Sequence, residues 1–441
     1  MTLARLIAIS FSSSALGFLL ELLLAWKYGA SPELDAFRLS QSVFLIGSQL
    51  LVWQLLPHVV VPMFTGLRAR QGEAAAWRSV LAVHGTFVIA GVGLAAAIAL
   101  FPEAIARWIA PGITGPGADL LPGYMLAVAA AGTLYVLAGT LAAALSVHGQ
   151  FAIGILPPLC VNLCLIGMVA ALPSTRPLAA LGGGTVLGAA IAYAAHVAAV
   201  RRARRESGAS DRLAPGIQVE GGGASLTGLL VPLGAAIAFG HAATIFVQRT
   251  LSLQSVGSIA LFSFALRLTT LVYTPAALYG NTAFPALAAA VDATDQTQFK
   301  TALRKALART IVLSAPLAAV LWVVRGPMVR LLFGTGKLDA DALDSITAMF
   351  GWMVLSSPMG AVVALMGKVF SAIRNRWAIV GPPAIALVLL ALTARPLAGE
   401  YGAEGVAMAF AVYTFAIAAL QMAALQLAGP RAVTTVAAMR K

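Results

Sequence analysis

The chain contains a long series of apolar stretches, each about as long as a helix that crosses a lipid bilayer. Such a helix needs roughly 20 apolar residues. Apolar and polar residues do not alternate at every second position, so the pattern favours helices over barrel strands. The sequence therefore predicts an all-α polytopic membrane protein with about twelve transmembrane helices, at residues 3–28, 36–66, 75–101, 120–147, 151–173, 177–200, 225–250, 256–282, 303–333, 342–370, 377–396 and 402–428.

The charge distribution supports this reading and gives a topology. Only 10% of the residues are charged, whereas soluble domains carry about a quarter. A net charge of +13 would also suit a nucleic-acid-binding protein, but nineteen of the 29 lysines and arginines fall on one predicted side of the membrane. The positive-inside rule makes that side cytoplasmic. We expect both termini there, in a multi-pass protein of the bacterial inner membrane that binds no nucleic acid.

The two halves of the chain resemble each other. The segment 145–158 and the segment 370–383 each contain a span end, a polar turn, an aromatic residue and a double proline. Upstream of them, 101–112 parallels 325–336. Parallel repeats of this kind place a substrate path between the halves of a transporter. The expected division is an N-lobe of six helices, a cytoplasmic linker and a C-lobe of six helices, related by a pseudo-two-fold axis, at 1–200, 201–224 and 225–441.

No sequence pattern predicts an enzyme. GGGTVLG (182–188) lacks the lysine of a phosphate-binding loop and lies in a span. Cys160 and Cys164 fit no disulfide or metal framework, and the five histidines are scattered. We expect no catalytic residues, no metal and no cofactor. The arginines at 201–205 fit the positive-inside rule, and they also have the chemistry to hold anionic lipid headgroups.

Polar residues inside the spans are the candidates for function, because ionisable groups there usually face a cavity or a partner. Glu21 and Arg267 each lie roughly 12–15 Å from the outer boundary, counting 1.5 Å per residue. We expect them to pair or to share one aqueous cavity. The alternatives are a neutral packed acid at Glu21 and a snorkelling or structural Arg267. Gln41, Ser48 and Gln54 would form a polar stripe that either faces water or bonds a neighbouring helix.

Several stretches resemble one family of membrane transporters. ALGFLLELLLAWKYGASPELDAF (15–37) and VVVPMFTGLRARQGE (59–73) are similar to the start of the MurJ (MviN) lipid II flippases, within the multidrug/oligosaccharidyl-lipid/polysaccharide exporter superfamily. Later landmarks resemble the family too, at GQFAIGILPPLCVN (149–162), VGSIALFSFALRL (256–268), FPALAAAV (284–291) and LFGTGKLDADAL (332–343). The resemblance implies two six-helix lobes around a V-shaped central cavity that work by alternating access.

The resemblance also assigns site residues. The family's acids in and after the first helix correspond to Glu21 and Asp35, and its helix-eight arginine corresponds to Arg267. The first-lobe cavity arginines of the family are not matched, since this chain has Ser14, Leu20, Ser48 and Gln49 there, and Leu266 replaces the acid beside Arg267. This favours a different lipid-linked glycan or a binding mode that uses Arg38, Arg249 or Gln49. The expected substrate-binding residues are Arg267, Glu21, Asp35, Gln49, Ser48, Arg38 and Gln54.

The function that the resemblance implies is a flippase. It would move an undecaprenyl-diphosphate-linked saccharide, lipid II-like or an exopolysaccharide repeat unit, from the cytoplasmic to the periplasmic leaflet. Its partners would be that glycan lipid and membrane lipids, with coupling to an ion gradient or the membrane potential, in a monomeric protein. Two alternatives remain, a cation-coupled exporter of small amphiphiles and a non-transporting scaffold with the same fold.

Overall fold

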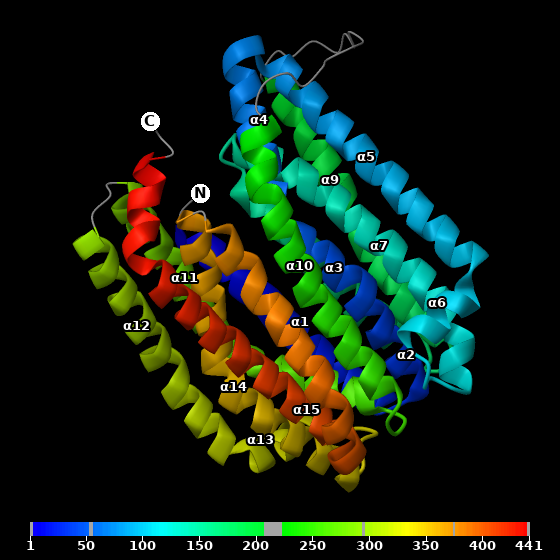
Figure 1. Cartoon of the computed structure of the whole chain (residues 1–441). Helices are drawn as coiled ribbons and strands as arrows, with labels where there is room; N and C mark the ends of the chain where they lie inside the picture. The colour runs from blue at the N-terminus through cyan, green and yellow to red at the C-terminus, as the bar shows by residue number, and fades with distance from the viewer. Residues whose placement is uncertain (1–2, 53–55, 207–222, 293–295, 374, 439–441) are drawn as a thin grey trace. The chain divides into compact units, whose positions relative to one another are not determined.

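A computed structural model describes residues 3–52, 56–206, 223–292, 296–373 and 375–438 (Figure 1). Every regular element in these ranges is a helix, which confirms the all-α fold class. The chain divides into two compact units, residues 1–230 and 231–441. Most of the expected linker, 201–224, lies outside the described residues.

The first unit holds nine whole helices of the described chain, the start of α10 and three short π or 3-10 segments, and α7 is its central element. Helix α7 packs against α2, α5 and α9, and α8 packs against α1 and α9. The bounds are α1 (Leu3–Tyr28), α2 (Pro32–Ser40), η1 (Gln41–Leu45), α3 (Ile46–Leu50), α4 (Leu56–Gln71), α5 (Glu73–Leu100), α6 (Pro102–Ile109), α7 (Pro116–Ser146), η3 (Phe151–Ile155), α8 (Leu156–Ala171), η4 (Leu178–Gly183), α9 (Gly184–Glu206) and the start of α10 (Gly223–Ser252).

The helices of this unit approach closely where α7 and α9 carry glycine. A Cβ atom added at Gly132 would lie 2.6 Å from Ser48 Oγ, and one at Gly188 would lie 2.5 Å from Val161 Cα. Small residues have this role in membranes because lipid is as apolar as the side chains, so close packing rather than water exclusion holds helices together. The glycines of α7 and α9 therefore set how near α3 and α8 can lie.

The turn after α7 is tied to α5 by a polar and aromatic cluster. His148 Nε2 lies 2.8 Å from Glu73 Oε1, and the His148 ring stacks on Trp77 with ring centroids 5.6 Å apart. Phe64 meets Trp77 edge-on at 5.0 Å. Phe64 and Trp77 belong to the buried core formed by α4, α5, α7 and α9. This cluster closes one end of the unit.

The second unit is built around α11 and α14, which pack on each other, while α14 also packs on α12 and α15. Its core includes Leu287, Phe299, Met366 and Phe370, all almost fully buried. The elements are α10, α11 (Ser258–Asp292), α12 (Gln296–Val323), α13 (Arg325–Phe333), α14 (Ala340–Ala372) and α15 (Arg376–Ala438). Helix α15 changes direction at Gly402, whose φ of 58° suits glycine, and so supplies both of the last two expected helices.

Several expected spans differ from the structure. For the range 256–282, α11 continues to Asp292. The range 303–333 is not one helix, because α12 ends at Val323 and α13 begins at Arg325. Val324 has a non-helical ψ of 8°, and Pro327 has no N–H to bond back across the break. The range 36–66 begins earlier, at Pro32, because Ser31 accepts a hydrogen bond from Leu34 N–H and caps the helix.

One of the two segment pairs that the sequence matches forms similar elements. The 101–112 segment contains α6 and the 325–336 segment contains α13, and each is a short helix between two long ones. Seven helices of the described chain are long and apolar enough to cross a membrane. The count of twelve spans stays a prediction.

Candidate functional site

A buried ion pair joins the first two helices. Arg38 Nη2 in α2 donates to Glu21 Oε2 in α1, and both residues are buried, with 6% and 7% of their surface exposed. Arg38 Nη1 also donates to Gln41 Oε1 at 2.8 Å. A charge taken out of water has to be paired and hydrogen-bonded to remain ionised. Glu21 is therefore an ionic partner in this structure and not an isolated acid.

The α1–α2 hairpin explains why these two residues meet. Helix α1 ends at Gly29, whose φ of 63° favours glycine, and its N–H bonds back to Ala25 O at 3.0 Å. Ser31 then begins α2. Glu21 lies eight residues before Gly29 and Arg38 seven after Ser31, so both lie roughly 10–12 Å from the turn. The two side chains are placed opposite each other at one depth.

A buried acid and an aromatic contact lie close to Arg38 in the chain. Asp35, one helical turn before Arg38, is also buried, with 6% exposed. Phe37 meets Tyr124 of α7 edge-on, with ring centroids 5.5 Å apart. The π-helix η1 begins at Gln41, directly after this group. Short π segments inside α-helices occur frequently at functional sites, so the local backbone marks the same position as the charges.

The expected polar stripe of the second helix is only partly assembled. Gln41 accepts from Arg38 and so belongs to the ion-pair group. Ser48 Oγ donates to Phe44 O at 2.7 Å and lies against Gly132 of α7. Gln49 is half-buried in α3, and Gln54 lies outside the described residues. Ser48 thus lies at a contact between helices, nearly three turns after Arg38.

Arg267 belongs to the second unit. It is half-buried in α11, where its carbonyl accepts from Thr270 Oγ1 at 2.6 Å. Gln248 in α10 is buried, with 2% exposed, and its Oε1 has no hydrogen-bond partner within the described ranges. Arg249 beside it is half-buried. The pairing of Arg267 with Glu21 stays a prediction.

The sequence predicts Glu21 and Arg38 as separate candidates and does not pair them. Lys27 makes a second contact that the sequence does not predict, since its Nζ donates to Val169 O and Leu172 O at the end of α8. That position suits a cation, because the last carbonyls of a helix carry partial negative charge. The available signal was the equal distance of Glu21 and Arg38 from the Gly29–Ser31 turn.

A second polar group lies among α5, α7 and α9. His84 Nδ1 is 3.1 Å from Thr140 Oγ1, and His84 Nε2 is 2.9 Å from Tyr193 OH. The Thr140 hydroxyl donates to Leu137 O at 2.7 Å, so toward His84 it can only accept. His84 Nδ1 therefore donates to Thr140, and a neutral ring would accept from the Tyr193 hydroxyl at Nε2. This group links three helices.

Residues that could ligate a metal do not gather anywhere in the described part of the chain: no three His, Cys, Asp or Glu side chains lie together there. Cys160 and Cys164 are free and half-buried. The group in the first unit that could bind an anion is the guanidinium of Arg38, which contacts the Glu21 carboxylate and the Gln41 amide. A guanidinium is the group that best recognises phosphate oxygens, through two parallel N–H donors.

Comparison with solved structures finds several whole-chain likenesses. "Lipid II flippase MurJ, inward closed conformation" aligns with a TM-score of 0.81 at 16% identity, over 96% of this chain and 87% of that chain. An inward-facing multidrug resistance MATE family transporter of the MOP superfamily also has a TM-score of 0.81, at 14% identity, over 97% and 99%. A MOP superfamily transporter from Pyrococcus furiosus gives 0.68 at 14% identity, over 100% and 95%. At these identities the likenesses show the fold.

Comparison by sequence supplies the family. No curated protein matches the chain significantly. The sequence profile described as "Lipid II flippase MurJ", however, matches residues 24–438, nearly the whole chain. It includes Arg38 and Arg267 and begins just after Glu21. This protein therefore belongs to the MurJ family of lipid II flippases, multi-pass proteins of the inner membrane.

Proposed function

We propose that this protein flips an undecaprenyl-diphosphate-linked saccharide from the cytoplasmic to the periplasmic leaflet by alternating access. The family match over residues 24–438 supports a flippase of lipid-linked precursors. The observation that carries the finer proposal is the buried Arg38, held between Glu21 and Gln41 beside a π-helix. A diphosphate needs such a cation in a sheltered site, whereas its lipid tail can remain in the bilayer.

In this proposal Glu21 neutralises the charge of the buried Arg38 when no substrate is bound. Arg38 needs a counter-charge wherever it is buried. Glu21 provides it in this structure, and a substrate diphosphate would replace it. Asp35, Ser48, Gln49, Gln54 and Arg267 remain proposed further contacts to the headgroup.

Purified protein in liposomes provides the test. Undecaprenyl-diphosphate lipids with fluorescent headgroups, carrying lipid II or exopolysaccharide repeat sugars, would be assayed by quenching of the outer-leaflet dye. We expect the wild type to flip one of these lipids and Arg38→Met/Glu21→Leu to flip it at least tenfold more slowly. Arg70→Met, which removes one exposed arginine of α4, is the matched control and should flip at the wild-type rate. Equal flipping rates for the wild type and Arg38→Met/Glu21→Leu would reject the proposed role of Arg38.

The second candidate is a cation-coupled exporter of small amphiphiles. The observation that favours it is the likeness to the MATE transporter, which extends over 99% of that chain. Two buried acids, Glu21 and Asp35, lie close together in sequence on the α1–α2 hairpin. The same liposomes would discriminate the two candidates: efflux of a cationic dye driven by a proton or sodium gradient, with no flipping of any diphosphate lipid, would favour the exporter. A protein inactive in both assays would match the scaffold alternative.

A further inference from the structure

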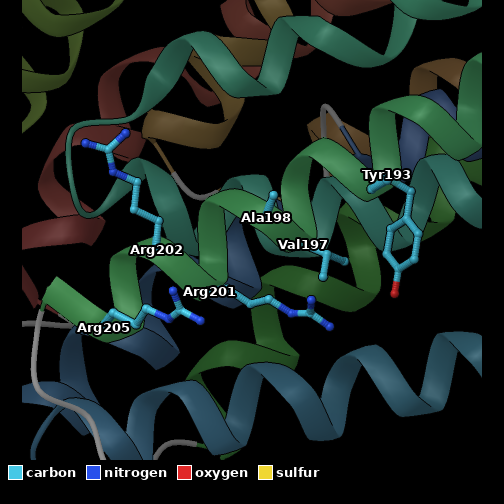
Figure 2. Close-up of a pocket in the computed structure, with 7 residues that line it drawn as sticks. Tyr193, Val197, Ala198, Arg201, Arg202 and Arg205 are labelled. Carbon is cyan, nitrogen blue, oxygen red and sulfur yellow. The ribbon is translucent and has the colours of Figure 1, made fainter.

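The end of α9 forms one wall of a hollow that the ion-pair site does not use. It has a volume of about 690 Å³ and is lined only by α9 among the described residues (Figure 2). This volume falls in the usual range for small-ligand sites. The lining changes along the helix from apolar to basic, with Tyr193, Ala194, Val197 and Ala198 followed by Arg201, Arg202 and Arg205.

The spacing of these residues builds a continuous stripe. Tyr193, Val197, Arg201 and Arg205 follow one another at intervals of four, which places them on one side of a helix. Figure 2 shows the side chains of Tyr193, Arg201 and Arg205 reaching the same side of α9, with Arg202 extending away from them. Along the helix the wall of the hollow is therefore apolar from Tyr193 to Ala198, and two guanidinium groups, of Arg201 and Arg205, lie at its end.

The depth of the arginines matches the lipid headgroups. The apolar span that includes η4 and α9 begins at Leu178. Arg201 lies 23 residues later, roughly 34 Å along a helix, which is just beyond a hydrocarbon core of about 30 Å. Tyr193 lies roughly 12 Å deeper, at the level of acyl chains. Arg201 and Arg205 are exposed.

The two arginines have no protein partner in the described ranges. No ion pair or hydrogen bond joins Arg201 or Arg205 to any described residue. The deeper wall, in contrast, is satisfied internally: the Tyr193 hydroxyl bonds His84 Nε2 at 2.9 Å, and the two rings stack with centroids 5.7 Å apart. Because its hydroxyl is occupied, Tyr193 contributes mainly ring carbon to the hollow. Among these groups, the hydrogen-bond donors that a ligand could still satisfy are therefore those of Arg201 and Arg205.

We propose that this hollow binds an anionic phospholipid of the cytoplasmic leaflet, with the headgroup phosphate on Arg201 and Arg205 and an acyl chain along Tyr193, Ala194 and Val197. Charge complementarity selects the occupant, because the cytoplasmic leaflet is the source of anionic headgroups next to an apolar phase. The positive-inside rule accounts for arginines at this end of α9 but not for an apolar hollow that leads to them. The proposal does not depend on the proposed flippase activity.

The test is lipid retention measured by native mass spectrometry on protein released from nanodiscs that mix phosphatidylglycerol with phosphatidylcholine. Wild type should retain phosphatidylglycerol preferentially. Arg201→Gln/Arg205→Gln should bind it about 25-fold more weakly, at roughly fivefold for each arginine near an anionic surface. Arg304→Gln/Lys305→Gln removes two exposed cations from the predicted cytoplasmic end of α12 and is the matched control. It should retain the lipid as wild type does.

Ala194→Trp separates a lipid site from a charged surface. Ala194 is exposed in the deeper, apolar part of the wall, so the indole would fill the acyl-chain path and leave both arginines in place. We expect Ala194→Trp to bind phosphatidylglycerol at least tenfold more weakly than wild type. Three results would overturn the proposal. The first is an equal loss of phosphatidylglycerol binding in the two double variants, and the second is wild-type phosphatidylglycerol binding by Ala194→Trp. The third is displacement of the lipid by undecaprenyl diphosphate or inorganic phosphate to the same extent in wild type and Ala194→Trp.

Discussion

At the scale of residues, Glu21 and Arg38 have to be considered as one unit. Removing one member of a buried ion pair leaves an uncompensated charge, which typically costs about 3–5 kcal/mol. Replacing both members by apolar residues of similar volume is often close to neutral. The pair is consequently weak evidence for a stabilising role, and its retention in a membrane helix favours a functional one.

This reasoning gives a prediction that separates stability from transport. Glu21→Leu and Arg38→Met should each lower the free energy of unfolding by about 3–5 kcal/mol. The double variant should recover most of that loss and yet remain inactive in flipping. Thermal unfolding in detergent would measure the stabilities, with Arg70→Met as the exposed control. Additive losses in the double variant would show that the two residues are not coupled in the protein interior.

At the scale of elements, the helices of the first unit depend on glycine where backbone meets backbone. Gly188 is the clearest case, because an added Cβ would lie 2.5 Å from Val161 Cα and 2.7 Å from Cys160 O. Backbone atoms of α8 cannot rotate away as a side chain could. Gly85 in α5 is a matched helical glycine, with no atom within 4 Å of its added Cβ.

The corresponding prediction concerns this pair of glycines. Gly188→Ala should destabilise the protein by about 1–3 kcal/mol through overpacking. Gly85→Ala should be neutral or stabilising by up to about 1 kcal/mol, since alanine is the better helix former. Melting temperatures of the two variants in one detergent would check this. A Gly188→Ala variant as stable as Gly85→Ala would mean that α8 and α9 are less closely packed than the structure has them.

Some element boundaries depend on local chemistry that hydropathy alone does not detect. Helix α2 begins at Pro32, four residues before the expected span 36–66, although Gly29, Ser31 and Pro32 are recognisable capping residues. The expected span 303–333 does not show the break between α12 and α13, although Arg325 and Pro327 stand at it, because the apolar residues on both sides resemble one long run. Hydropathy measures the length of a run and does not detect a backbone break inside it.

At the scale of the whole molecule, the distribution of charge makes a prediction about topology. Arg70 in α4 lies on the expected cytoplasmic side and Arg107 in α6 on the periplasmic side, and both are exposed. In a background without Cys160 and Cys164, a membrane-impermeant thiol reagent applied to spheroplasts should label Arg107→Cys but not Arg70→Cys. Lysis should make both reactive. Labelling of Arg70→Cys before lysis would reverse the predicted orientation.

The sequence by itself determined the class, the family and most helix positions of this protein. Apolar length, capping residues and loop charge are local properties, so they can be read without knowing which helix lies beside which. The tertiary structure decided the partners. Which charges meet depends on the rotation of each helix about its axis, where one residue changes a side chain's direction by about 100°. For that reason only the fold could pair Glu21 with Arg38 and place His84 of α5 against Tyr193 of α9.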